Sequence, residues 1–264
     1  MFSSRSTTAA IGTPERQFAR ELEVFRTEAE TAAQFFYTYL AMHEVAKRHK
    51  KVFRMFNEHP LFWNTLLGGV QTAALIAFGR VFDQDSPHNV DAVLGLAQRH
   101  RDIFSKAALG KRKQGNAREA PEWLPDFLST AYESTPNDFR RLRKLVKNHR
   151  RRYEKNYRNL RNQYYAHKAA ADPDEIQRLV ATTNIREMQR MFTFFLQLHQ
   201  TLQELFNNGQ RPVLRPFRHS ARRITQRPSA HPPGDAVHEH ITKQASQALL
   251  GPAQQQKPPR QRTK

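Results

Sequence analysis

The chain has 264 residues, with 43 Lys and Arg against 24 Asp and Glu, and no cysteine. The missing cysteines exclude a disulfide framework, a zinc–thiolate site, an iron–sulfur cluster and a cysteine nucleophile. Neither G-x-G-x-x-G nor G-x-x-x-x-G-K occurs, which argues against dinucleotide-binding and P-loop folds. No apolar run approaches the length of a membrane span, and the first residues lack the apolar core of a secretory signal. We therefore expect a cytoplasmic protein without a membrane partner.

The first half of the chain is predicted to be helical. From Thr13 to about Asn57 apolar residues recur every three or four positions, which predicts one long amphipathic helix or two helices with a break midway. Residues 61–81 are apolar nearly all round and are predicted to form the buried central helix of a bundle. Further along we expect a loop over 83–89, a helix from Ser86 or Asn89 through Ile103, a loop over 110–121 and a short helix within 121–132.

Two long helices are predicted in the second half, and residues 172–175 are expected to begin either a further helix or a helical turn between them. One is long and basic, from Asp138 to about Ala170, and the other has an apolar face and runs from Thr183 to Asn207, where Gly209 stops it. No run of alternating β-branched residues indicates a sheet. The predicted fold class is therefore all-α, a bundle of long helices.

Composition divides the chain into a flexible N-terminus (1–13), a helical bundle domain (14–208) and a disordered tail rich in Pro, Arg and Gln (209–264). The tail carries 11 Lys and Arg against two acids, and it has too few apolar side chains to offset the entropy of ordering. One short helix is expected in it, around residues 236–250. The tail is interpreted either as a solvated linker or as a non-specific arm for nucleic acid.

The positive charge of the bundle comes from one segment. Between Phe139 and Lys168 there are 12 Lys and Arg and a single acid, Glu154, whereas the rest of residues 1–208 is close to neutral. Such a concentration of charge attracts polyanions, and RNA is the partner we expect. The side chains expected to contact RNA are the cations Arg151, Arg152, Arg158 and Lys168 and the rings of Tyr164 and Tyr165, which can stack on bases.

Within this segment, Arg161 and Asn162 are followed by His167. These residue types suit cleavage of a phosphodiester. Histidine can move a proton to or from a ribose 2′-hydroxyl or a leaving oxygen, and arginine can bind a phosphate as its charge grows. On one straight helix Arg161 and His167 would lie about 120° apart. Either they flank a groove, or the helix is disturbed here, or each faces a second copy of the chain.

The run Arg161-Asn162 with Tyr165-Ala166-His167, near the end of a long basic helix, resembles the HEPN superfamily and is most similar to its abortive-infection AbiU-type branch. The resemblance implies a helical bundle, a homodimer and a metal-independent endoribonuclease used in phage defence or toxin–antitoxin systems, where an antitoxin protein is a further partner. It makes Arg161 the phosphate-binding residue, His167 the acid–base and Asn162 an auxiliary polar residue. Asp83 is the candidate for orienting them.

Two positions depart from the family pattern. Ala169 stands where HEPN toxins with nucleotidyltransferase antitoxins have a tyrosine, so inactivation by adenylylation of that residue is not supported. Lys168 follows the histidine where an acid is expected soon after it. A second hypothesis therefore stays open: a non-catalytic HEPN-fold module that binds nucleic acid or a partner protein through the basic helix and the tail.

No metal site and no cofactor are predicted. His43 and His49 are six residues apart, a poor spacing for two ligands on one helix. His238 and His240 in the tail cannot converge on one face and are expected to lie in solvent.

Overall fold

The computed structural model describes residues 13–84, 86, 88–162, 178, 183–214, 221–222 and 236–255. No strand occurs among these residues, which confirms the all-α prediction. In chain order the helices are α1 (Thr13–Arg48), α2 (Lys50–Glu58), α3 (Pro60–Phe82), α4 (Val90–Arg99), the 3₁₀ turn η1 (Arg101–Phe104), α5 (Lys106–Gln114), α6 (Leu124–Thr130), α7 (Pro136–Asn156), α8 (Arg158–Leu160), α10 (Ile185–Asn208) and α12 (Val237–Gln255).

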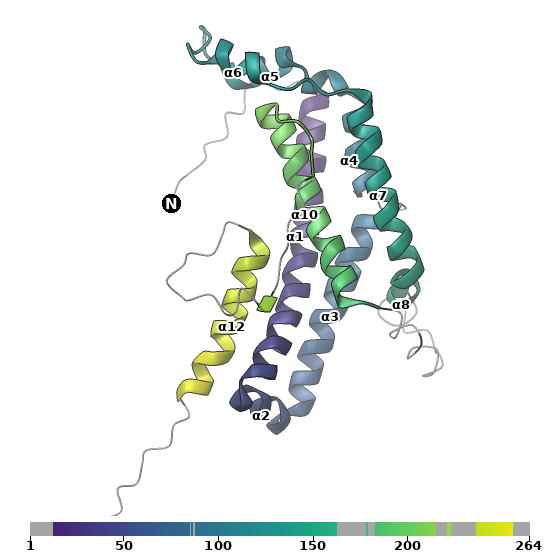
Figure 1. Cartoon of the computed structure of the whole chain (residues 1–264), viewed down its shortest axis with the longest axis vertical. Coiled ribbons are helices and arrows are strands. Elements are labelled where there is room, and N and C mark those ends of the chain that lie inside the picture. Colours follow the sequence, from purple (N-terminus) through teal and green to yellow (C-terminus); the bar gives the residue numbers. More distant parts are fainter. Residues whose placement is uncertain are drawn as a thin grey trace, which may run out of the picture.

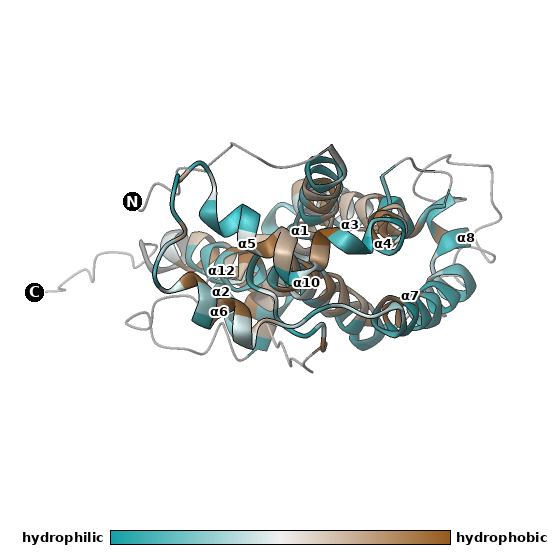
Figure 2. Cartoon of the chain, turned by 90° about the horizontal axis from the view of Figure 1, so that it is seen from above, coloured by the Kyte–Doolittle hydropathy of each residue, from teal (hydrophilic) through white to brown (hydrophobic). Residues whose placement is uncertain are grey.

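α1 is the helix around which the bundle is arranged, and α3, α4, α10 and α12 all contact it (Figure 1). The core between these helices is strongly aromatic, and burial of each phenylalanine contributes about 1.5–3 kcal/mol. Seen from above, α7 presents a hydrophilic outer face (Figure 2). Ring contacts join Phe18, Phe104 and Phe206 at one end of the core, Phe36, Phe78 and Phe192 further along it, and Phe78, Phe82 and Phe195 beside them.

The first long helix is broken, but near its end rather than midway. α1 ends at Arg48, and His49 leaves the helical conformation with φ −114° and ψ 99° before α2 begins.

The prediction that residues 61–81 form a buried central helix is wrong for the first half of α3. From Ala74 onward α3 lies in the core, with Phe78 and Phe82 fully buried, but Leu61 and Phe62 are 83% and 60% exposed. A pattern that is apolar all round does not tell which part of the helix its neighbours cover.

The prediction that no apolar run reaches the length of a membrane span is also wrong for α3. By length and composition alone this helix could cross a membrane. One such helix is weak evidence of a span because the core helices of soluble proteins pass the same test. In this fold, the last turns of α3 pack in the core against α1 and α10.

The loop predicted over 110–121 begins later than expected, because α5 continues to Gln114. Ser105 caps α5 by accepting a hydrogen bond from the backbone N–H of Ala108. Arg112 then holds α5 to the bundle: its guanidinium donates to the backbone oxygens of Ile103 and Phe206 and pairs with Glu15. The polar, glycine-containing composition of this segment predicts a loop, but the tertiary contacts of Arg112 stabilise the helix to Gln114.

The long basic helix is shorter than predicted. It starts at Pro136, and Thr135 caps it by donating from its N–H and hydroxyl to Asp138 Oδ2, each at 2.8 Å. It ends at Asn156, because Tyr157 adopts φ −128° and ψ −29° and only the short α8 follows. Residues 163–170, where the helix was expected to continue, and residues 172–175 lie outside the described residues.

α10 confirms the last predicted helix of the bundle, and it ends where expected, at Gly209. This glycine has φ +58°, and a Cβ there would lie 2.8 Å from both the Cβ of Ala131 and Cδ2 of Leu109. Both the left-handed conformation and the close approach favour glycine.

The short helix predicted in the tail is present as α12, which packs against α1 (Figure 1). His238, Thr242, Ser246 and Leu249 form its buried face. The expectation that His238 lies in solvent is therefore wrong, since this side chain is only 2% exposed and contacts the ring of Tyr37. The bundle extends past residue 208 to include α12.

Candidate active site

The packing of α7 against α3 brings the basic helix to the carboxyl end of α3. Tyr153 of α7 stacks on Phe82, with ring centroids 5.2 Å apart, and meets Phe78 edge to face at 5.5 Å. All three rings are buried. These contacts fix where the last turn of α7 lies relative to the end of α3.

The break after α7 is held by Tyr157, which is fully buried. Its hydroxyl donates to the backbone oxygen of Asn184 and accepts from the backbone N–H of the same residue, both at 3.1 Å. Asn184 is the N-cap of α10, so the break is tied to the start of that helix. Burial raises the pKa of the Tyr157 phenol, which stays neutral.

Beyond this break Arg161 meets Asp83, the residue that ends α3. Both terminal nitrogens of Arg161 donate to Asp83 Oδ2 at 3.3 Å, and Nε donates to Oδ1 of the neighbouring Asn162 at 2.9 Å. The two charged side chains are partly buried, 17% and 28% exposed. The guanidinium is therefore oriented by a carboxylate from one helix and an amide from its own segment.

Gly79 forms the surface on which the Arg161 side chain lies. A Cβ at position 79 would be 2.3 Å from Nη1 of Arg161, 2.5 Å from its Cδ and 2.9 Å from the Tyr153 hydroxyl. No side chain fits between α3 and the guanidinium. The carbonyl of Gly79 also accepts from the Asp83 N–H at 2.8 Å, which closes the last turn of α3.

The Tyr153 hydroxyl completes this group of residues. It is buried and has no hydrogen-bond partner among the described residues. Burial raises the pKa of Tyr153 to about 12, so the phenol stays protonated at neutral pH. We call Gly79, Asp83, Tyr153, Arg161 and Asn162 the Arg161 cluster.

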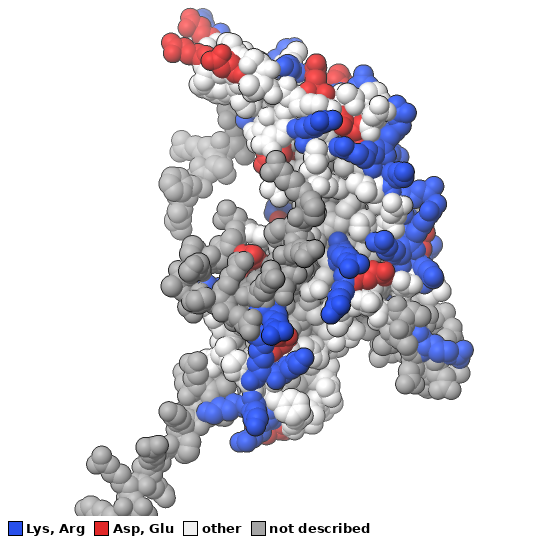
Figure 3. All heavy atoms as spheres, in the orientation of Figure 1, with Lys and Arg blue, Asp and Glu red and all other residues white. Residues whose placement is uncertain are grey.

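A line of cations runs along the exposed face of α7 toward this cluster (Figure 3). Its members recur at intervals of three or four residues, so they share one face of the helix, opposite the buried face that carries Phe139, Leu142 and Val146. Glu154 is the exposed acid beside them. This basic stripe consists of Arg140, Lys144, Lys147, Arg151 and Lys155 of α7, followed by Arg158 of α8.

The residues predicted from the sequence fall into two groups. Arg161, Asn162 and Asp83 come together as described, Arg151 and Arg158 lie in the basic stripe, and Arg152 is exposed beside it. His167, Tyr164, Tyr165 and Lys168 lie outside the described residues.

A disturbed helix was one of three alternatives for the motif, and the disturbance found begins before the motif, at a position that was not predicted. The regular helix is interrupted at Tyr157, and residues 161 and 162 form a wider, π-type turn. The angle of about 120° calculated for a straight helix therefore does not apply to this segment.

Two residues of the cluster, Gly79 and Tyr153, were not anticipated. A glycine inside a helix lowers the stability of the helix by about 1 kcal/mol relative to alanine, so its presence often indicates a close contact with a neighbouring segment. This was the one signal in the sequence for Gly79. Tyr153 gave no signal beyond its apolar spacing in α7.

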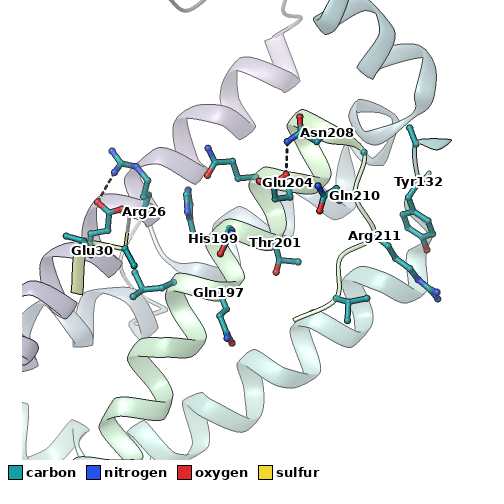
Figure 4. Close-up of a pocket in the computed structure, with 18 of the residues that line it drawn as sticks. Arg26, Glu30, Tyr132, Gln197, His199, Thr201, Glu204, Asn208, Gln210 and Arg211 are labelled. Atoms are coloured by element: carbon teal, nitrogen blue, oxygen red, sulfur yellow. Dashed lines mark hydrogen bonds and ion pairs between the residues drawn. The ribbon is translucent and has the colours of Figure 1, made fainter. Parts of the chain in front are cut away.

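A groove lies elsewhere, between α1, α6, α10 and the start of α12 (Figure 4). Its volume is about 1400 Å³, and no member of the Arg161 cluster lines it. Arg26 and Glu204 in its wall are engaged with Glu30 and Asn208. Burial lowers the pKa of His199, which also lines the groove, to about 4, so this ring is neutral at pH 7. The Arg161 cluster is therefore the candidate site.

The described part of the chain contains no group of three or more His, Asp or Glu side chains placed to hold a metal ion. The acidic member of the Arg161 cluster, Asp83, is paired with Arg161.

Comparison with known proteins gives one match. No curated protein and no solved structure matches the chain. The family model for HEPN domains of the AbiU2 type matches residues 15–226, which include the Arg161 cluster and most of the bundle. The chain therefore belongs to the AbiU2 family, an abortive-infection domain of the HEPN type.

Proposed function

We propose that this protein is a metal-independent endoribonuclease and that Arg161 is the residue that binds the scissile phosphate. The observation that carries the proposal is the guanidinium of Arg161, oriented by Asp83 and Asn162 beside a stripe of cations. An arginine held in this way can meet a phosphate without first reorganising.

The nucleophile of the proposed reaction is the ribose 2′-oxygen of the RNA itself, so the protein does not have to supply one. The ribose 2′-oxygen loses its proton and bonds to the adjacent phosphorus, the bond from phosphorus to the 5′-oxygen breaks, and the 5′-oxygen takes up a proton. The products carry a 2′,3′-cyclic phosphate and a 5′-hydroxyl. Negative charge that builds on the non-bridging oxygens is stabilised by Arg161, and His167 is the residue assigned to proton transfer.

The basic stripe supplies affinity for the RNA strand. On α7, from Arg140 to Lys155, it covers about 22 Å, since a helix rises 1.5 Å per residue. Its last member is three residues before Arg161. RNA lying along α7 would therefore be led to the Arg161 cluster, with phosphates paired to Lys and Arg and no base-specific contact required.

A homodimer is part of this proposal. His167 of one copy can complete the site with Arg161 of another, which removes the need for both side chains to share one face of a helix. An antitoxin protein that covers the basic stripe would suppress the activity, because it would compete with RNA for the same cations.

The test is cleavage of an end-labelled single-stranded RNA by wild type, Arg161→Gln and Arg150→Gln. Arg150 is a matched control, because it is also partly buried on α7 and paired with a carboxylate, that of Asp91. The proposal predicts that Arg161→Gln is slower by at least about 100-fold and that Arg150→Gln is close to wild type. Equal rates for the two variants would contradict the role of Arg161. Tight RNA binding without cleavage by folded wild-type protein would favour the binding module instead.

A further inference from the structure

The end of the molecule where α2 turns into α3 exposes large apolar side chains. Phe53 is 57% exposed, Leu61 83%, Phe62 60% and Leu66 39%. Four of the eight large exposed apolar side chains of the described residues are found here. We call residues 47–66 the α2–α3 tip. Such a patch on a folded protein indicates an interaction surface for a membrane or for another protein.

The α2–α3 tip is a packed structure and not a frayed helix end. Beneath it lies a second apolar cluster, separate from the main core, in which Phe56 and Trp63 stack with ring centroids 4.4 Å apart. The exposed side chains are therefore presented by helices that pack on this cluster through Val52 and through partly buried side chains such as Phe56 and Trp63. The buried members of this cluster are Met42, Val45, Ala46, Val52 and Leu249.

Cations on α2 and at the end of α1 form a basic rim on one side of the exposed apolar side chains. Lys47, Lys50, Lys51 and Arg54 are all exposed, and Lys and Arg side chains gather at the end of the molecule where α2 lies (Figure 3). Glu58 is the single acid between residues 47 and 79. The α2–α3 tip thus combines aromatic and aliphatic side chains with a basic rim, the combination that binds anionic membrane surfaces.

The depth available for insertion is limited by the fold. Leu75, Phe78 and Phe82 are buried in the main core, so α3 cannot cross a bilayer. The exposed part, from Leu61 to about Val70, is about 15 Å long. A helix end of this length suits the interface between headgroups and acyl chains.

Charge also distinguishes a lipid surface from a second copy of the chain. Two copies meeting through the α2–α3 tip would bring two basic rims together, whereas lipid phosphates would neutralise them. We propose that the α2–α3 tip docks on an anionic lipid surface, with Phe53, Leu61 and Phe62 entering the headgroup region and Lys50, Lys51 and Arg54 facing lipid phosphates. This differs from the expectation of no membrane partner, and it is independent of the proposed ribonuclease activity.

The test measures binding of the full chain, freed of RNA, to vesicles of phosphatidylcholine with and without phosphatidylglycerol. The tip variant Phe53→Ser/Leu61→Ser/Phe62→Ser keeps every charge, including those of the basic stripe. The control variant Trp123→Ser/Ile185→Ser/Val213→Ser removes three exposed apolar side chains from elsewhere. We expect the tip variant to lose at least about tenfold in affinity for phosphatidylglycerol vesicles and the control variant to match wild type. Equal binding by the tip variant and wild type would overturn the proposal.

A second readout reports insertion directly. The chain has two tryptophans, so Trp123→Phe leaves Trp63, which packs beneath the tip, as the sole reporter. Brominated acyl chains should quench its fluorescence in phosphatidylglycerol vesicles, and the tip substitutions should abolish the quenching. If the tip variant instead changes a dimer to a monomer, and neither form binds vesicles, the tip is a self-association surface and the lipid proposal is wrong.

Discussion

Gly79 and Arg161 are in direct contact, although 82 positions separate them in the sequence. The guanidinium lies where a side chain at position 79 would be, so that even a methyl group there would be 2.3 Å from Nη1. The orientation of Arg161 therefore depends on the absence of a side chain on α3 as well as on its bonds to Asp83 and Asn162.

Gly79→Ala is expected to displace Arg161 and to slow RNA cleavage by at least about tenfold. The new Cβ overlaps both Nη1 and Cδ of Arg161, and moving a positioned catalytic group by about 1 Å can cost 100-fold in rate. Cleavage of a labelled RNA and thermal unfolding, measured on the same preparation, separate loss of activity from loss of fold.

Gly69→Ala is the matched control, since it lies on the same helix with nothing within 4 Å of the added Cβ. Alanine there should raise stability by up to about 1 kcal/mol through helix propensity and leave cleavage unchanged. Equal cleavage by both alanine variants would show that the contact between Gly79 and Arg161 has no functional consequence.

Asp83→Asn should reduce the cleavage rate while preserving RNA affinity. The amide keeps the shape of the side chain but removes the negative charge that orients the guanidinium. Asp91→Asn is the comparison, because Asp91 pairs with Arg150 of α7 in a similar partly buried setting. We expect about a tenfold lower rate for Asp83→Asn and little change for Asp91→Asn; the reverse order would assign Asp83 a purely structural role.

Removing cations from the basic stripe should weaken RNA binding and its dependence on salt. For Lys144→Gln/Lys147→Gln/Arg151→Gln, the slope of log affinity against log salt should fall by about 2, because each phosphate contact on a single strand contributes about 0.7. A variant with the same net charge, Arg16→Gln/Arg20→Gln/Lys111→Gln, removes exposed cations away from the stripe. A slope that depends only on net charge, and not on position, would contradict the proposed path of the RNA along α7.

Acid should destabilise the bundle through His238. This ring is buried against Tyr37, and burial lowers its pKa to about 4, below the value of about 6.5 in the unfolded chain. The unfolded chain therefore binds more protons between these values, so the stabilisation is fully present above about pH 6.5 and is lost as the pH falls toward 4, at up to about 1.4 kcal/mol per pH unit.

The check is the free energy of unfolding by urea, measured from about pH 7 to about pH 4.5. His238→Gln should make the decline shallower, whereas His240→Gln, at an exposed position of the same helix, should not. His149 and His199 also have pKa values lowered to about 4 by burial, so part of the decline should remain in both variants. A decline unaltered by His238→Gln would show that this ring is not buried in its neutral form.

Much of the fold could be predicted from the sequence, because its helices have a clear apolar periodicity and recognisable capping, proline and glycine residues at their ends. The end of α10 at Gly209 and the helix within the tail were expected, whereas the break in the first long helix was expected midway and lies at His49. The burial of α12 was not expected. The composition of this proline-rich, basic segment does not indicate burial, which depends on the contact between α12 and α1. The exposure of Leu61 could not be foreseen for the same reason: it depends on which neighbours α3 lacks.

The candidate site was partly predictable. Arg161 and Asn162 were recognised as a motif, and Asp83 was placed at the end of its helix as a candidate partner. The contact with Gly79 was not predictable, because it depends on how closely α3 and the segment after α7 approach one another. The break at Tyr157 was missed as well, since its cause is the pair of hydrogen bonds to Asn184, a residue far along the chain.

The most direct test of the central claim is the chemistry of the cut ends. Purified wild type, Arg161→Gln and His167→Ala would be incubated with RNA in excess EDTA, and the termini of the products identified. The account predicts cleavage by wild type with 2′,3′-cyclic phosphate and 5′-hydroxyl ends, and its loss in both variants. Cleavage that stops in EDTA, or that His167→Ala performs as fast as wild type, would contradict a metal-independent reaction at the Arg161 cluster.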